Sequence, residues 1–172
     1  MIDADAISRS VTAAGGAAIG PLLAAFGSAA IAADGALDRD WMRSLVFADP
    51  AAKLRLEHIV HPLVGNEIAR QTVGAQAQGA RCLVLDIPLL VESGHWRKKV
   101  DRILVVDCTE ATQIERVVRR SGLARSAVQT IIDAQSSRRR RREAADAVIF
   151  NEGKSLHEIG DELARWGAQF GL

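Results

Sequence analysis

The fold is decided by the stretch LVLDIPLLVES at residues 83–93. Its first half is an unbroken apolar run that ends in Asp86 and Pro88, a pattern typical of a parallel strand buried on both faces. In open α/β sheets, ligands bind beyond the carboxyl ends of the strands, so the segment from Asp86 to Glu92 is expected to line a crevice. The alternative is that Asp86 only caps the following turn, and the stretch alone favours neither interpretation.

Further strand patterns lie on both sides of this stretch. Ile2 looks like the end of a strand, residues 101–107 repeat the pattern of a buried strand with an acidic end, and residues 147–150 form a last short strand. Helical patterns separate these segments. Strands that alternate with helices predict an α/β fold with a mostly parallel sheet.

Apolar residues recur at helical spacing between the predicted strands. Pro62 is expected to kink or divide the longest of these helices, and Ser126 is expected to cap another. The closing helix is expected to contribute core residues at helical spacing: Leu156, Ile159, Leu163, Trp166 and Phe170. The predicted helices cover about residues 15–26, 38–49, 50–68, 114–120, 126–132 and 156–170.

The composition is that of a single globular domain over residues 1–172, with 48% hydrophobic and 25% charged residues. No stretch approaches the ~20 apolar residues that span a bilayer, so no membrane association is expected. Cys82 and Cys108 lie outside any Cys-x-x-Cys spacing, which predicts reduced, buried thiols in a cytoplasmic protein. The net charge of +1 gives no global attraction to nucleic acid. Positive charge is instead concentrated at residues 138–142.

Acidic strand ends and a late arginine cluster suggest phosphoryl transfer, which calls for a phosphate-binding loop of the form Gly-x-x-x-x-Gly-Lys-Ser/Thr. The sequence contains no such loop. Residues 74–81 have the glycine spacing, but they precede a strand and lack the lysine and hydroxyl. Residues 153–155 lie between a strand and a helix, but the first glycine position falls on Val148 and Glu152 would repel a phosphate.

Two aspartates at the start of the chain are candidates for chemistry. Asp3 and Asp5 lie on one face if the strand of Ile2 continues, because alternate strand residues share a face. One carboxylate would then order the site or a metal, while the other accepts a proton from an attacking hydroxyl. The alternative is that both are turn residues that open a helix at Ile7.

The arginine cluster can place at most Arg138, Arg141 and Arg142 on one helical face. Polyphosphate binding by one or two of them is the favoured interpretation, with Arg116 adding to a positive lid. A nucleic-acid patch is the alternative, but the cluster lacks interleaved aromatic residues.

His58 and His61 lie three residues apart on one predicted helical face, which could suggest a metal pair. The neighbouring sequence offers no carboxylate or cysteine to complete the ligand set, so no metal site is expected there. His61 more simply marks the kink at Pro62.

Strings along nearly the whole chain resemble the dephospho-CoA kinase family. Each string alone is weak evidence, but together, in the family's order and spacing, they are highly specific. The strings are IDADAISR at 2–9, DGALD at 34–38, VFAD at 46–49, HPL at 61–63, DIPLLVE at 86–92, Gln135 with Arg138 and Arg141, and ADAVIFN at 145–151.

The resemblance implies a P-loop kinase fold with a five-stranded parallel core, a helical CoA-binding lobe at about 15–78 and a lid region at about 112–145. It implies transfer of the γ-phosphoryl group of ATP, with Mg²⁺, to the ribose 3′-hydroxyl of dephospho-CoA. Oligomeric state is not implied.

Site residues follow from the same resemblance. Asp5 matches the family's proposed general base and Asp3 its companion, while Arg141 matches the lid arginine that meets the ATP phosphates. The other matched positions are Arg138 and Arg116 on the ATP side, and Arg9, His61 and Glu92 on the acceptor side.

The chain departs from the family at its start. Family members begin roughly 30 residues earlier, about one strand-helix unit, with a strand, the Gly-rich loop and its helix. The absent strand would lie between residues 83–87 and 103–106, so these strands should face a gap of roughly 10 Å or collapse together. We hypothesise that the true start lies upstream of Met1. The rival to this hypothesis is a genuine truncation or an inactive remnant. The alternatives to a dephospho-CoA kinase are a noncatalytic CoA-binding remnant, another small-molecule P-loop kinase and an arginine-rich nucleic-acid binder.

Overall fold

The computed structural model describes residues 1–94 and 96–172 and divides the chain into two compact units, Met1–Pro88 and Leu89–Leu172. Each unit contains one parallel pair of strands, which confirms the predicted parallel pairing. Within the described residues these two pairs are the only sheets, in place of the five-stranded core that the resemblance implies. The pairs are β1 (Ile2–Asp3) with β2 (Leu85–Asp86), and β3 (Leu104–Asp107) with β4 (Ala147–Phe150).

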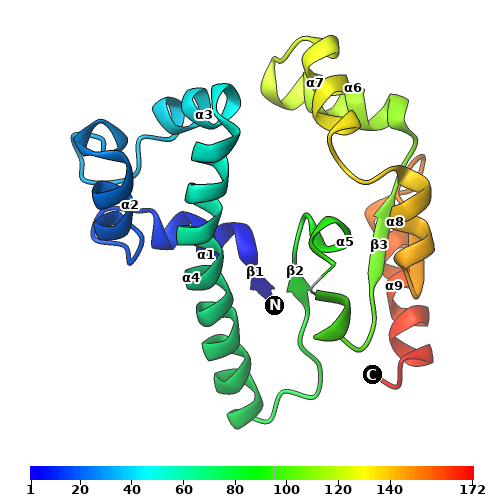
Figure 1. Cartoon of the computed structure of the whole chain (residues 1–172). Helices are drawn as coiled ribbons and strands as arrows, with labels where there is room; N and C mark the ends of the chain where they lie inside the picture. The colour runs from blue at the N-terminus through cyan, green and yellow to red at the C-terminus, as the bar shows by residue number, and fades with distance from the viewer. Residues whose placement is uncertain (95) are drawn as a thin grey trace. The chain divides into compact units, whose positions relative to one another are not determined.

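Four helices form most of the first unit. Helix α4 is the longest and packs against the other three, as Figure 1 shows. The core between them is apolar and consists of Ala18, Leu22, Ala30, Leu37 and Met42. The helices are α1 (Ala4–Val11), α2 (Ile19–Phe26), α3 (Arg39–Ala48) and α4 (Pro50–Ala77), with a 3₁₀ turn, η1 (Ser28–Ala30), between α2 and α3.

The end of α2 and the start of α3 lie at residues that commonly cap helices. Gly27 follows α2 with a φ of 78°, a value that favours glycine. Asp38 caps α3 because its carboxylate accepts the Trp41 N–H at 2.9 Å. Both predicted boundaries are therefore confirmed.

Helix α4 runs unbroken through Pro62 over 28 residues, so the predicted division of the helix at this proline is wrong. A proline inside a helix removes one backbone hydrogen bond, and the packing of α4 against α1, α2 and α3 offsets that loss. In the part of the chain that the structure describes, not even α4 is both long and apolar enough to cross a membrane.

The second unit carries the remaining helices around β3 and β4 (Figure 1). Helix α7 begins at Arg125 after Ala124, which makes no side-chain cap, so Ser126 is not the predicted cap. The helices are α5 (Leu90–Ser93), α6 (Glu110–Ser121), α7 (Arg125–Asp133), α8 (Arg138–Ala144) and α9 (Leu156–Gln169), with a 3₁₀ turn, η2 (Trp96–Lys98).

Three apolar segments are more exposed than their patterns predict. No residue of α9 is buried, and Leu156 is 89% and Leu163 44% exposed, so the predicted core face of this helix is wrong. Val84, just before β2, and Val106, in β3, are also largely exposed, which contradicts burial on both faces. The reason is that β2 pairs only with β1, and β3 only with β4, among the described residues. A strand with one neighbour leaves its second edge and part of its faces open.

Candidate active site

The first candidate site lies at the carboxyl end of β1, where Asp3 caps α1. One carboxylate oxygen of Asp3 accepts the Ala6 N–H at 2.8 Å, and the other lies 3.7 Å from the guanidinium of Arg9. The strand ends at Asp3 and a helix begins at Ala4, so the strand does not continue and the helix starts before the predicted Ile7. Asp3 and Asp5 do not share a strand face, because Asp3 ends the strand and Asp5 lies in the first turn of the helix.

The two aspartates therefore differ in availability. Asp3 is engaged by the local backbone and by Arg9. Asp5 lies exposed in the first turn of α1, and no hydrogen bond or ion pair engages its carboxylate within residues 1–94 and 96–172. The free carboxylate of Asp5 is thus able to accept a proton from a bound ligand.

A further carboxylate lies beside Asp3 at the same sheet edge. The register of β1 and β2 pairs Asp3 with Asp86, and paired positions on neighbouring strands are about 5 Å apart with side chains on the same face. No group of three or more His, Cys, Asp or Glu side chains that could hold a metal occurs in the described residues. Mg²⁺ commonly takes only one or two carboxylates and completes its shell with phosphates and water, so this edge fits it.

The predicted acceptor-side residues of this unit lie on two helices that pack together. Arg9 is in the last turn of α1, and His61 is exposed on α4. Sequence reasoning missed a contact near Arg9: Arg39 donates to the hydroxyl of the buried Thr12 at 2.8 Å. This bond ties the start of α3 to the end of α1.

The second candidate site lies at the carboxyl end of β3, around Asp107. Arg138 donates hydrogen bonds from two of its nitrogens to this carboxylate, at 2.8 Å each, and Asp107 is only 6% exposed. The hydrogen bonds from Arg138 hold the pKa of Asp107 below its usual value, against the opposing effect of burial. Arg138 therefore anchors α8 to β3, and its charge is largely neutralised inside the protein.

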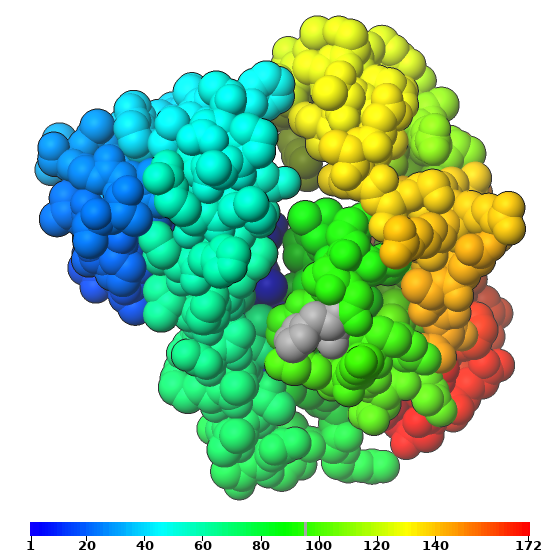
Figure 2. All heavy atoms as spheres, in the orientation of Figure 1, coloured from blue at the N-terminus to red at the C-terminus, as the bar shows by residue number. Residues whose placement is uncertain are grey.

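The other arginines of α8 differ in their partners. Arg141 donates to the carbonyl of Ser136 at 2.5 Å, and Arg139 pairs with Glu143 at 2.7 Å. Arg142 is half exposed and lies 3.8 Å from Asp107. Helix α8 lies at the molecular surface, in yellow-orange in Figure 2. An open hollow of about 430 Å³ beside it is lined by Arg138, Arg139, Arg142, Glu143 and Val148.

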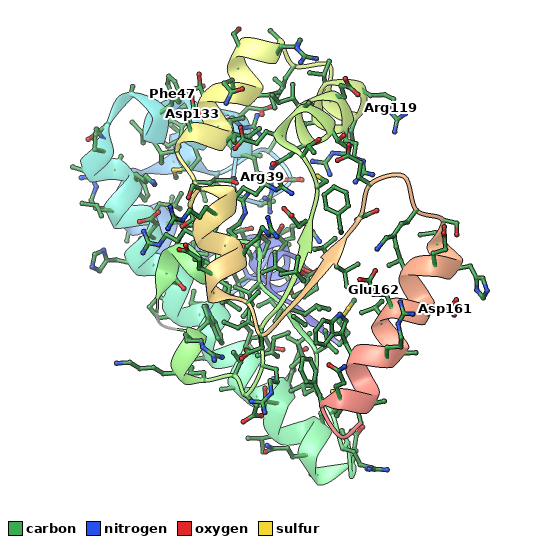
Figure 3. The ribbon with its side chains drawn as sticks, turned by 90° about the vertical axis from the view of Figure 1, so that its right-hand side faces the viewer. Arg39, Phe47, Arg119, Asp133, Asp161 and Glu162 are labelled. Carbon is green, nitrogen blue, oxygen red and sulfur yellow. The ribbon has the colours of Figure 1, made fainter. Side chains whose placement is uncertain are left out.

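The carboxyl end of β4 is tied to the start of α6. Arg116 donates to the carbonyl of Asn151 at 2.7 Å, and Glu152 accepts the Thr109 N–H at 2.9 Å. The hydrogen bonds of Glu152 with Thr109 lower the pKa of this carboxyl. Arg119, in contrast, projects outward from α6 (Figure 3). Arg116 of α6 is thus held by a backbone carbonyl, whereas Arg119 is exposed to solvent.

The segment 153–155 has no free cation for a phosphate. Lys154 pairs with Glu162 of α9 at 2.6 Å. Ser155 is the N-cap of α9, where it forms a capping box with Glu158. The side chains of Lys154 and Ser155 are therefore both engaged by α9.

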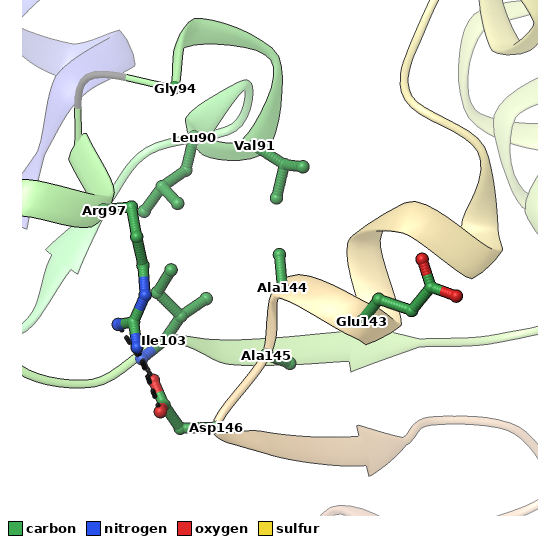
Figure 4. Close-up of a pocket in the computed structure, with 9 residues that line it drawn as sticks. All are labelled: Leu90, Val91, Gly94, Arg97, Ile103, Glu143, Ala144, Ala145 and Asp146. Atoms are coloured by element: carbon green, nitrogen blue, oxygen red, sulfur yellow. Dashed lines mark hydrogen bonds and ion pairs between the residues drawn. The ribbon is translucent and has the colours of Figure 1, made fainter.

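A smaller hollow of about 260 Å³ lies at the amino ends of β3 and β4 (Figure 4). Apolar side chains such as Leu90 and Ile103 line much of it. Its arginine, Arg97, is paired with Asp146 at 3.1 Å. This hollow lies at the end of the strands opposite Asp107, away from the edge where ligands bind in α/β sheets.

Two residues that hold α8 in place in the second unit have only weak signals in the sequence. The sequence marks Asp107 as an acidic strand end, but it gives no sign of the pairing of Asp107 with an arginine 31 positions later. Ser136 was not singled out, although its N–H donates to Glu92 at 2.8 Å while its carbonyl accepts from Arg141. The serine pair before the arginines was the only available signal.

Comparison with known proteins gives one consistent result. A family model described as "Dephospho-CoA kinase" matches residues 1–157. A dephospho-CoA kinase from Albidiferax ferrireducens is 52% identical over 172 residues, which cover all of this chain and 81% of that protein. The one from Bordetella parapertussis is 56% identical over 153 residues, covering 89% of this chain and 70% of that protein.

Solved structures share the fold. A Thermus thermophilus protein of known crystal structure superimposes with a TM-score of 0.76 at 30% identity, covering 98% of this chain and 83% of that one. A dephospho-CoA kinase from Campylobacter jejuni superimposes with a TM-score of 0.69 at 21% identity, with the same coverage of both chains. The predicted α/β fold of the P-loop kinase type is therefore confirmed.

Proposed function

Because this chain belongs to the dephospho-CoA kinase family, we propose that it transfers the γ-phosphoryl group of ATP to the ribose 3′-hydroxyl of dephospho-CoA, giving CoA and ADP. One observation carries the proposal: the family model matches residues 1–157, which include every site residue assigned by resemblance. A nucleic-acid-binding role is less well supported, since three arginines of α8 have partners within the protein.

We assign the general base to Asp5. Its exposed carboxylate would accept the proton of the 3′-hydroxyl as that oxygen attacks the γ-phosphorus. Asp3 would act beside it by capping α1 and so fixing the direction of the first turn. Arg9 and His61 are proposed to contact the acceptor.

The phosphate side of the reaction is assigned to α8 and its surroundings. Phosphoryl transfer depends on positioning and charge neutralisation, which arginines supply through bidentate hydrogen bonds. Arg141 is the proposed phosphate ligand, while Arg138 and Arg116 hold α8 and the Asn151 loop in place. When bound at the edge of Asp3 and Asp86, Mg²⁺ would neutralise phosphate charge. A cytoplasmic location is also proposed, on the cysteine spacing alone. The predicted burial of the thiols is wrong for Cys82, which is exposed.

The test is a direct assay of ATP-dependent CoA formation. Because the printed sequence contains no Gly-x-x-x-x-Gly-Lys-Ser/Thr loop, the assay should use this chain and a chain extended by the codons upstream of Met1. We expect 3′-phosphorylation of dephospho-CoA, and a loss of about 10²–10⁴-fold in kcat for Asp5→Asn. If neither chain converts dephospho-CoA, the proposed function is wrong.

A binding control separates the kinase from a noncatalytic CoA-binding protein. Titration calorimetry with dephospho-CoA reports acceptor binding without turnover. Binding of dephospho-CoA without CoA formation by either chain would favour the noncatalytic alternative. Salt-sensitive binding to arbitrary RNA without any dephospho-CoA binding would instead favour the nucleic-acid alternative.

A further inference from the structure

Ser136 is held from both sides in the turn between α7 and α8. Its N–H donates to a carboxylate oxygen of Glu92 at 2.8 Å, and its carbonyl accepts from Arg141 at 2.5 Å. Glu92 lies on α5, 44 residues earlier in the chain, whereas Arg141 lies on α8 itself. The turn is thus fixed by two side chains: Glu92, from outside α8, and Arg141, from α8 itself.

The bond from Glu92 is of a strong kind. A hydrogen bond to an ionised carboxylate contributes more than one between neutral groups, and both partners are partly buried. Its position also matters, because Ser136 precedes Ser137, the N-cap of α8, whose hydroxyl accepts the Arg140 N–H. Movement at Ser136 would therefore shift the start of α8 and remove the carbonyl that Arg141 binds.

From this geometry we propose that Glu92 is a positioning residue, which acts through Ser136 to hold Arg141 in place for the ATP phosphates. The inference rests on the proposed function and gives Glu92 a role on the phosphate side, where the family resemblance had suggested acceptor binding. Asp107 and Arg138 fix the next residues of the same helix, so α8 is held at two successive points.

The kinetic test compares Glu92→Ala with Glu92→Gln, whose amide oxygen still accepts the Ser136 N–H. For Glu92→Ala we expect the KM for ATP to rise about tenfold, while the KM for dephospho-CoA changes less than about twofold. Glu92→Gln should stay within about threefold of the wild type for both substrates. A larger rise in the KM for dephospho-CoA than for ATP would overturn the proposal and indicate direct acceptor binding.

A second measurement tests the contact without turnover. Amide hydrogen exchange of Ser136 should become at least about tenfold faster in Glu92→Ala, since its charged acceptor is lost, and should remain slow in Glu92→Gln. Glu67→Ala is the control, because it also removes a hydrogen-bonded glutamate, one that binds Arg70 within a helix of the other unit rather than Ser136. Unchanged exchange at Ser136 in Glu92→Ala would refute the proposal. Failure of the proposed function would appear separately, as an absence of CoA formation by the wild-type and extended chains.

Discussion

Arg138 and Asp107 form a bidentate ion pair, in which Nε and one Nη of the arginine each lie 2.8 Å from a different carboxylate oxygen. The aspartate ends β3 and the arginine begins α8, so the pair joins the sheet to the arginine helix. Arg138 also lies over the ring of Phe150 at 5.8 Å, at the end of β4. One side chain thus fixes α8 against both strands of this unit.

Removing the acid of this pair is expected to destabilise the second unit. In Asp107→Ala, Arg138 loses its partner in a partly buried position, and we expect the free energy of unfolding to fall by about 3 kcal/mol. Urea unfolding followed by tryptophan fluorescence in a Trp41→Phe background measures it, because the remaining tryptophans lie in this unit. Glu143→Ala, which breaks an exposed pair with Arg139, should cost less than about 0.5 kcal/mol. Equal losses in the two variants would contradict this prediction.

The ion pair of Asp107 with Arg138 should make the free energy of unfolding depend on pH. The pKa of Asp107 is lowered in the folded chain, so the unfolded chain binds a proton more readily. The stabilisation is therefore complete above the unfolded pKa of about 3.9 and is lost as the pH falls through the lower folded pKa. We expect the stability difference between wild type and Asp107→Asn to be constant from pH 7 to 5 and to shrink below pH 4. A constant difference down to pH 2.5 would exclude this mechanism.

The sequence predicted local features better than the environment of the strands. Asp38 and Gly27 mark helix ends through short-range chemistry, and both were located correctly. The burial of Val84 and Val106 depends on which strand lies alongside, a long-range property that the apolar pattern does not encode.

The candidate site was predictable in its residue types but not in their pairing. Asp3, Asp5 and the arginine cluster were recognised as chemistry-bearing. Whether an arginine is paired inside the protein depends on contacts between residues far apart in the sequence, such as that of Arg138 with Asp107. The contact of Glu92 with Ser136, which positions the arginine helix, is of the same long-range kind. Spacing within a helix gives no information on such contacts.

The two aspartates of the first unit should respond differently to substitution. Asp3→Ala removes the cap of α1 and is expected to cost about 1 kcal/mol of unfolding free energy, whereas Asp3→Ser should retain most of it, because serine also caps helices. Asp5→Asn should change stability by less than about 0.5 kcal/mol, although it removes the proposed base. Urea unfolding of each variant, paired with the CoA-formation assay, separates the two effects. A stability loss in Asp5→Asn as large as in Asp3→Ala would contradict the assignment of distinct roles.

Two glycines of the second unit should respond to alanine with opposite signs. Gly122 ends α6 with a φ of 71°, and a Cβ there would meet no atom within 4 Å, so Gly122→Ala costs only backbone strain, about 1 kcal/mol. Gly160 lies exposed inside α9, where a Cβ is equally unobstructed, so Gly160→Ala should stabilise by up to about 1 kcal/mol. Thermal unfolding of the two variants in the Trp41→Phe background measures both. Since neither methyl group contacts a neighbour, the difference in sign would come from the backbone conformation alone, and two changes of the same sign would contradict the left-handed end of α6.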